Sequence, residues 1–250
     1  NAAAEKLKAA GIIPFAHGGQ AWQDATVFEA VAMGLGGNNY YKNCYVDLKE
    51  SCLRSETTVK VFDQMRKLQS YTDEGSPGRD WNVATGMVIE GKAGFQIMGD
   101  WAKGEFTAAG KVPGVDYYCA ATPSNNGYLY NVDSFIFYKS SDPDKQAGQQ
   151  LLAKLMMGKN FQKVFNLYKG SIPARLDVSM DEFDKCAKTS NADIKTAGAK
   201  GGLVPSFAHG MAQGNTMKAA LQDIITEHFN SDMSSVDAAN ALADSVLANM

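Results

Sequence analysis

The segment that most constrains how this chain can fold is residues 91–106, GKAGFQIMGDWAKGEF. Its first half, residues 93–98, is mostly apolar and has the length of a buried strand. Gly99 and the good helix N-cap Asp100 follow, and Trp101 then opens a predicted helix. Trp101 is therefore expected at the carboxyl end of a strand, where open α/β sheets bind ligands. The local pattern fits either a core tryptophan or an aromatic platform for a ligand.

The composition predicts a globular protein that does not bind nucleic acid. The chain has 250 residues, enough for one large domain or two small ones. Apolar residues make up 45% and charged residues 20% of the chain, which provides a sizeable core. The formal net charge is −3 and the basic residues are scattered, whereas nucleic-acid binding normally needs a basic face. No apolar run reaches the length of a transmembrane helix.

The first residues indicate that an earlier part of the protein is missing from this chain. Residues 1–11 have the pattern of the body of a helix that stops at Gly11. They contain neither an initiating methionine nor a signal-peptide pattern. A natural protein seldom starts so abruptly, so we expect a longer parent protein.

Alternating strand and helix patterns predict an α/β protein. Strands are expected at 12–16, 93–98, 114–122 and 128–138, and helices at 20–33, 54–74, 80–89, from Pro143 onward and around 161–167. Glycine and asparagine at 34–39 predict a loop. Residues 176–250 are helical in pattern, with an interruption at 198–205.

Two polar residues interrupt the predicted strand at 128–138. Asn131 and Asp133 are two residues apart, so they face the same side of that strand. Buried polar groups need hydrogen-bond partners. These two side chains either bond to neighbouring loops or line a polar pocket.

The four cysteines form an even, dispersed set without CxxC spacing, at Cys44, Cys52, Cys119 and Cys186. Such a set fits one or two disulfides in an exported protein, or four buried thiols. The three histidines, His17, His209 and His228, are far apart in the sequence and are not paired at helical spacing. We therefore predict no metal site.

No catalytic motif is found in the sequence. The chain has no Gly-x-Ser-x-Gly elbow, no HExxH, no Walker lysine and no Rossmann fingerprint after a strand, and Ser171 near Lys169 has only a turn context. Tryptophans, an Asn/Asp pair, a lysine and a histidine instead stand at predicted loop or strand ends. Sugars need this mixture, because aromatic faces cover their C–H side and polar groups bind their hydroxyls. We therefore expect a binding protein without catalytic residues or cofactor.

Four motifs in order carry a resemblance to a known family. They are GKAGFQIMGDWAKGEF, YLYNVDSFIFY, YKGSIPAR and SFAHGMA. Together they resemble the extracellular solute-binding proteins of ABC sugar importers, most closely the glucose/mannose-binding branch. The resemblance covers essentially the whole chain. The opening residues resemble a mid-chain segment of that family, which again implies that the N-terminal part is missing.

The resemblance implies a two-lobe periplasmic-binding-protein fold of type II, α/β in class, with the first lobe incomplete. Residues 1–122 would then form most of the second lobe, and residues 123–172 the crossing segments and the returning part of the first lobe. Residues 173–250 would form the helical C-terminal part of the second lobe. The crossings are expected near 123–127 and 169–173, which have the composition of loops.

The resemblance also implies the ligand set. Trp101 matches a tryptophan that stacks on the sugar ring, and the polar matches are Asn131, Asp133, Lys169 and His209. Trp22 and Trp81 are assigned a structural role.

By the same resemblance, Cys119 and Cys186 are expected to form a disulfide. Cys44 and Cys52 are expected, less directly, to form a second one.

The resulting hypothesis is a monomeric receptor that is periplasmic, or extracellular and membrane-associated. It would trap a monosaccharide, glucose or mannose, by hinge closure and deliver it to the membrane permease of an ABC importer. One alternative is a glycosidase that uses a carboxylate pair. Another is a non-catalytic interaction domain in which the aromatic residues are all core.

Overall fold

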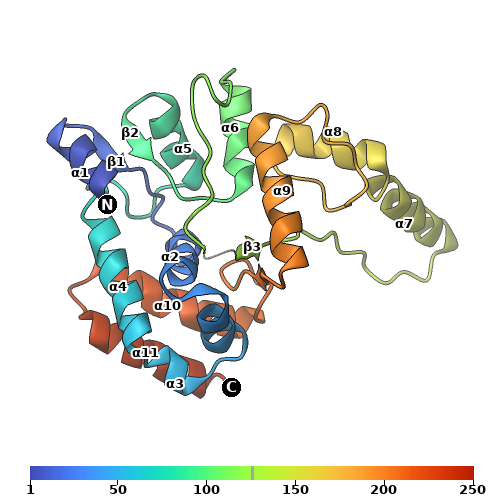
Figure 1. Ribbon diagram of the computed structural model, residues 1–250. Coiled ribbons are helices and arrows are strands. Elements are labelled where there is room, and N and C mark those ends of the chain that lie inside the picture. Colours follow the sequence, from blue (N-terminus) through green and yellow to red (C-terminus); the bar gives the residue numbers. More distant parts are fainter. Residues whose placement is uncertain (125–126) are drawn as a thin grey trace. The chain divides into compact units, whose positions relative to one another are not determined.

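The computed structural model describes residues 1–124 and 127–250 (Figure 1). The chain divides into two compact units, which we call unit 1 (residues 1–99, 120–131 and 193–250) and unit 2 (residues 100–119 and 132–192). The predicted lobe boundaries at 122 and 172 stay a prediction, because a division into compact units does not by itself identify the lobes of the fold. The predicted crossing at 123–127 includes residues 125–126, which lie outside the described residues.

Unit 1 combines helices with two small parallel sheets. Its first part contains α1 (Ala2–Ala9), β1 (Ile13–Phe15), α2 (Ala21–Tyr41), the π-helix η1 (Lys42–Val46), α3 (Glu50–Leu53), α4 (Glu56–Gln69), α5 (Trp81–Ile89) and β2 (Ala93–Phe95). Its later parts contain β3 (Tyr128–Tyr130), β4 (Leu203–Pro205), α10 (Asn215–Asn230) and α11 (Ser235–Ala248). Strand β1 pairs with β2, and β3 pairs with β4, both in parallel.

The core of unit 1 forms around α2. This helix packs against α4 and α10, and α11 in turn packs against α10 and α4 (Figure 1). Every α2 residue from position 23 to position 30 is buried, so α2 has no solvent face over this stretch. Phe28 lies at its centre, with ring centroids 5.0 Å from Phe62 and 5.7 Å from Tyr45. In contrast, α4 is amphipathic, and Ser55 caps its start by accepting a hydrogen bond from the Thr58 N–H.

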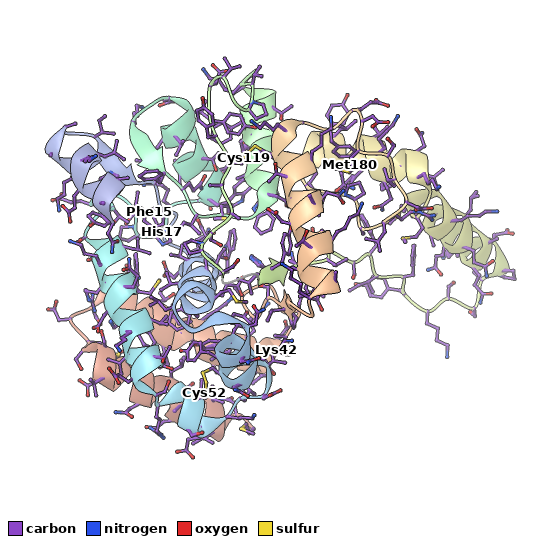
Figure 2. All side chains as sticks on the ribbon, viewed as in Figure 1. Phe15, His17, Lys42, Cys52, Cys119 and Met180 are labelled. Carbon is purple, nitrogen blue, oxygen red and sulfur yellow. A yellow bond between two sulfur atoms is a disulfide. The ribbon has the colours of Figure 1, made fainter. Side chains whose placement is uncertain are left out.

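Unit 2 contains short helices held by a disulfide and by polar contacts. Its elements are the 3₁₀ turn η2 (Asp100–Ala102), α6 (Lys103–Ala108), α7 (Pro143–Met156) and α8 (Lys159–Lys169), and α9 (Lys185–Ala199) starts in it. Cys119 and Cys186 form a disulfide with a Cα–Cα distance of 5.7 Å (Figure 2). Nearby, the buried Lys103 ammonium lies 2.6 Å from an Asp184 carboxylate oxygen. These contacts join α6 to the start of α9.

Both expected disulfides are present. The Cys119–Cys186 bond confirms the pairing that the family resemblance implies. Cys44 and Cys52 also form a bond, with a Cα–Cα distance of 5.1 Å, and this bond ties η1 to α3. The alternative of four buried thiols is therefore wrong.

Three strand predictions are wrong in whole or in part. Residues 114–122 form no strand, because a turn in which the Gly114 N–H donates to the Tyr117 carbonyl (2.7 Å) bends the chain. The strand at 128–138 ends at Tyr130, since no described strand pairs with the residues that follow. The strand at 93–98 is only three residues long, and only its first residue, Ala93, is buried, since Phe95 is 45% exposed.

Two predicted breaks in the chain contain regular structure. Residues 34–39 lie within α2, which runs to Tyr41 with one non-helical residue at Gly37 (φ 71°). Glycine tolerates that positive φ, so the helix is interrupted there without ending. The interruption at 198–205 contains β4, which pairs with β3.

A buried histidine makes the stability of unit 1 depend on pH. The His228 side chain on α10 is fully buried, and within the described part of the chain neither ring nitrogen has a hydrogen-bond partner. Its ring centroid lies 4.8 Å from that of Phe62. Burial, aided by the positive charge of Arg66, lowers the pKa of His228 to about 4. The folded protein therefore binds this proton less readily than the unfolded chain does.

We predict that acidification from pH 8 to pH 5 lowers the free energy of unfolding by about 2 kcal/mol through His228. The unfolded state binds the proton once the pH falls below about 6.5, while the folded state does so only near pH 4, so stability is lost across that window. Urea unfolding of the wild type and of His228→Leu at several pH values measures the effect. The variant should show a flatter dependence, and parallel curves would contradict the prediction.

Candidate functional site

Two candidate residues follow neighbouring strands of unit 1. Asn131 comes directly after β3, and the 206–209 segment comes directly after β4. The two strands are parallel, with Tyr130 opposite Pro205, and the Ser206 N–H donates to the Tyr130 carbonyl at 3.0 Å. Because the carboxyl ends of parallel strands meet at one edge of a sheet, Asn131 and the segment that carries His209 start from the same edge.

The His209 ring lies against the start of α2. Its Nε2 is 3.2 Å from the Thr26 hydroxyl, and its ring centroid is 5.9 Å from that of Trp22 in an edge-on arrangement. The Trp22 indole N–H donates to the Gln20 side-chain oxygen at 2.8 Å. Both Trp22 and His209 are half-buried, so part of each residue is open to solvent.

Trp22 therefore joins the candidate residues, although a structural role was expected for it. A signal for this role is present in the sequence. Trp22 and Thr26 are four residues apart in the first turns of a helix, which places both on one face. The sequence contains no sign that His209, far along the chain, contacts that face.

A tight turn sets the position of His209. Phe207 and Ala208 are buried and anchor the segment in the core. The Gly210 N–H donates to the Phe207 carbonyl at 3.1 Å, and Gly210 itself has a φ of +74°. Glycine adopts that conformation without strain, so the chain reverses immediately after His209.

In unit 2, the structure brings Asp133 and Lys169 together in an ion pair. Lys169 is the last residue of α8, and Gly170 ends the helix in the left-handed conformation (φ 89°). The Asp133 side chain is 62% exposed, so the pair contributes little to stability. The pair does, however, hold two charged side chains next to each other, and both can form hydrogen bonds with hydroxyl groups.

The segment that carries Trp101 is fastened to the loop after Lys169. The Asp100 carboxylate accepts a hydrogen bond from the Ile172 N–H at 3.1 Å. Burial raises the pKa of Asp100, and a hydrogen bond from Ser171 opposes that rise. A Cβ at Gly104 would lie 2.8 Å from the Lys169 carbonyl oxygen, so only glycine fits this close approach. Unit 2 therefore places the Trp101 segment next to the end of α8.

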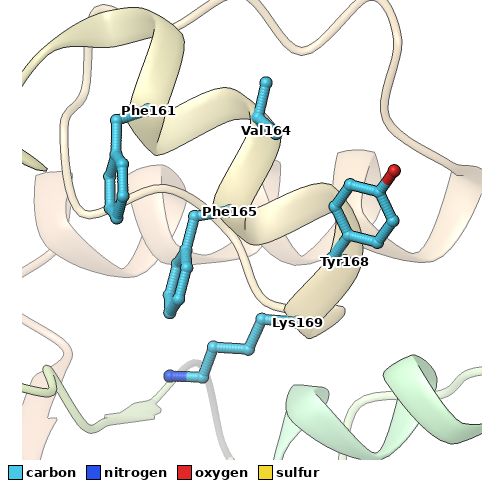
Figure 3. A pocket seen from close by; sticks show the side chains of 5 residues that line it. All are labelled: Phe161, Val164, Phe165, Tyr168 and Lys169. Carbon is cyan, nitrogen blue, oxygen red and sulfur yellow. The ribbon is translucent and has the colours of Figure 1, made fainter.

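A shallow pocket on α8 lies beside Lys169 (Figure 3). Its other lining residues are Phe161, Val164, Phe165 and Tyr168. The lining is almost wholly apolar, and the Phe161 and Phe165 rings in it stack with centroids 5.4 Å apart. It contains neither Trp101 nor Asp133, so it brings only Lys169 of the candidate residues to this surface.

Within residues 1–124 and 127–250, no group of three or more His, Cys, Asp or Glu side chains is placed to hold a metal ion. No helix in that part of the chain has the length and apolar character needed to cross a membrane. Lys169 is paired with Asp133, so it is not poised to activate Ser171.

We predict that Asp100→Ala lowers the free energy of unfolding by about 1–3 kcal/mol, because it leaves the Ile172 N–H without its partner. Asp116→Ala is the matched control. Asp116 is also an aspartate of unit 2 that accepts one backbone N–H, from Val112 at 2.8 Å, but it is exposed. Urea unfolding followed by circular dichroism compares the two variants. Equal small losses would show that Asp100 does not fasten the loop.

Residues 2–156 match the family model described as bacterial extracellular solute-binding protein. A "Probable sugar-binding periplasmic protein" of Brucella suis is 47% identical over 243 residues, covering 97% of this chain and 57% of that protein. An uncharacterized ABC transporter extracellular-binding protein of Pyrococcus horikoshii is 34% identical, covering 90% of this chain and 50% of that protein. The chain thus spans only half or a little more of each relative's length.

A solved structure of a chitin oligosaccharide binding protein is similar in fold. It matches with a TM-score of 0.74 at 16% identity, covering 96% of this chain and 61% of that protein. At this identity the likeness concerns the fold alone. It confirms the predicted α/β fold of the solute-binding type.

Proposed function

The chain belongs to the family of bacterial extracellular solute-binding proteins, and on that premise we propose that it is part of the receptor of an ABC sugar importer. The receptor would bind one sugar molecule, act outside the cytoplasmic membrane and pass the sugar to a membrane permease. The names of the two relatives, one sugar-binding and periplasmic and the other an ABC transporter component, support this proposal. It requires no chemical step and no cofactor.

The observation that carries the proposal is the ion pair of Lys169 with Asp133 in unit 2. These residues are far apart in the sequence, and the family resemblance matches Asp133 to a polar residue that binds sugar hydroxyls and Lys169 to a basic residue at the edge of the cleft. The pair contributes little to folding, which is expected of groups that are kept for a ligand. Such charged groups make strong hydrogen bonds with hydroxyls.

We propose Trp101, Asn131, Asp133, Lys169 and His209 as the ligand set, with Trp22 added because it contacts His209. The indole of Trp101 would cover the apolar face of a pyranose, and the polar side chains would bind its hydroxyls. A monosaccharide, glucose or mannose, fits the family branch that the four motifs resemble.

Unit 2 exposes apolar side chains that support a longer parent protein. Phe135, Ile136 and Tyr138 are 60%, 80% and 83% exposed, and on α7 Leu151 is 67% exposed. Exposed apolar surface on this scale indicates an interface. We propose that a further part of the same protein covers it and completes the first lobe, in keeping with the greater length of the relatives.

Thermal unfolding with and without glucose, mannose, galactose, maltose and xylose tests the function. A ligand at about 100 times its dissociation constant should add roughly 2.7 kcal/mol to the stability of the native state. A shift with one monosaccharide would support the proposal and name the sugar. If this chain shows no shift, the complete gene product is tested in the same way. Absence of a shift there, or turnover of an aryl glycoside, would contradict it.

We predict that Trp101→Ala in the complete gene product weakens sugar binding by roughly 1–3 kcal/mol, because the aromatic face against the sugar is lost. Isothermal titration calorimetry measures the change. Trp81→Ala, which removes a tryptophan of α5 that is not among the proposed ligands, is the matched control. Equal affinities of the wild type and Trp101→Ala would remove Trp101 from the site.

A further inference from the structure

A single buried carboxylate accepts hydrogen bonds from the segment that carries His209. Glu29, in the middle of α2, is only 3% exposed. Its Oε1 accepts a hydrogen bond from the Ser206 hydroxyl at 2.7 Å. Its Oε2 accepts from the Tyr41 hydroxyl at 3.0 Å and from the Ala208 N–H at 3.3 Å. Glu29 thus holds the segment at two of its residues directly.

Two of these donors hold the remaining residues of the segment. The Ser206 hydroxyl oxygen accepts a hydrogen bond from the His209 N–H at 3.1 Å. The Tyr41 hydroxyl oxygen accepts one from the Phe207 N–H at 3.1 Å. Through one or two hydrogen bonds, Glu29 is therefore connected to all four residues from 206 to 209.

The same helix face also contacts the His209 ring. Trp22, Thr26 and Glu29 are four and three residues apart on α2, so they share one face. Thr26 and Trp22 meet the imidazole, while Glu29 holds the backbone behind it. One rigid helix thus fixes both the ring and the main chain of a proposed sugar ligand.

Stability does not account for an acid at this position. Among the ion pairs of the described residues, none includes Glu29. Removing a carboxylate from water without a nearby cation destabilises the folded state, and its hydrogen bonds offset this loss only in part. A neutral side chain of similar size would avoid that cost. The Glu29 carboxylate is nevertheless the group to which the 206–209 segment is hydrogen-bonded.

We propose that Glu29 is a positioning residue for sugar binding, which holds the 206–209 segment so that the His209 imidazole keeps its place against Thr26 and Trp22. This role rests on the proposed function, since it matters only if His209 binds the sugar. Glu29 itself is buried and does not touch the ligand.

The charge of Glu29 changes near neutral pH, which gives the role a measurable signature. Burial raises the pKa of Glu29 to about 7, and its hydrogen bonds only partly oppose that rise. The ionised carboxylate accepts from all its donors, whereas the protonated form must donate through one oxygen and so loses an acceptor site. The segment is therefore held best above pH 7. The groups that face the carboxyl or end the segment are the Tyr41 phenol, the Ser206 hydroxyl, the N–H groups of Phe207 and Ala208, and His209.

The first test needs no sugar. Contacts of the His209 ring protons with Trp22 and Thr26 are followed by NMR, as nuclear Overhauser effects, from pH 5 to pH 9 in this chain, in the wild type and in Glu29→Gln. These contacts report the position of the ring, whereas ring chemical shifts also report the charge of an imidazole, which changes in this pH range. We expect the wild-type contacts to show a step with a midpoint near pH 7 that coincides with the titration of the Glu29 side-chain carboxyl carbon, and we expect Glu29→Gln to lack it. Wild-type contacts that do not change when Glu29 titrates would overturn the proposal, and this measurement needs no variant.

Asp24→Asn is the matched control for a buried acid of α2. Asp24 is fully buried, but its carboxylate bonds to His17 (2.6 Å) and to the Thr226 hydroxyl (2.8 Å) and not to the 206–209 segment. The step near pH 7 should persist in this variant. If Glu29→Gln does not fold, Ser206→Ala replaces it, because it removes the hydroxyl that links Glu29 to the His209 N–H. A step of unchanged size in a folded Ser206→Ala would overturn the proposal.

The second test uses the complete gene product and the sugar identified by thermal unfolding. At pH 8 we expect Glu29→Gln to bind about five- to tenfold more weakly than the wild type. Wild-type affinity should rise as the pH passes through about 7, and this rise should be reduced in the variant. Unchanged affinity and an unchanged pH profile would overturn the proposal. If the wild type binds no sugar, the proposed function fails, while the NMR titration still decides whether Glu29 positions His209.

Discussion

The packing of α2 is the constraint on which the rest of unit 1 depends. This helix is enclosed by α4 and α10, so its side chains fix where its neighbours lie. Its buried centre contains Phe28 in the aromatic core and Glu29 beneath the 206–209 segment. Its first turns present Trp22 and Thr26 to His209. A shift of α2 would therefore displace both the core side chains and the candidate ligand residues that contact this helix.

Unit 2 is held differently, because it has few buried apolar side chains. The Cys119–Cys186 disulfide and the Lys103–Asp184 pair take the place of a large core. Asp100 fastens the Trp101 segment to the loop after Lys169, and Lys169 holds Asp133. Polar contacts thus position the candidate ligands of unit 2, whereas α2 positions His209 of unit 1 through both side-chain packing and the hydrogen bonds of Glu29.

Helices were predicted better than strands, for a physical reason. The helices at 54–74, 80–89 and from Pro143 onward were expected and are present as α4, α5 and α7. A helix forms its backbone hydrogen bonds within one segment, so its pattern is visible in that segment. A strand needs a partner that the local sequence does not specify. The expected strand at 128–138 therefore ends at Tyr130, and β4 was not foreseen.

The sequence by itself determined the α/β class, the family resemblance and the Cys119–Cys186 pairing that it implied, and it suggested the five residues that we propose as ligands. These depend on residue types and their order along the chain, which the sequence contains in full. Only the tertiary structure decided that Lys169 pairs with Asp133, that Trp22 meets His209, and that Glu29 holds the 206–209 segment. The Glu29–Ala208 contact joins residues 179 positions apart, and such proximity arises only when α2, β3 and β4 pack into one core.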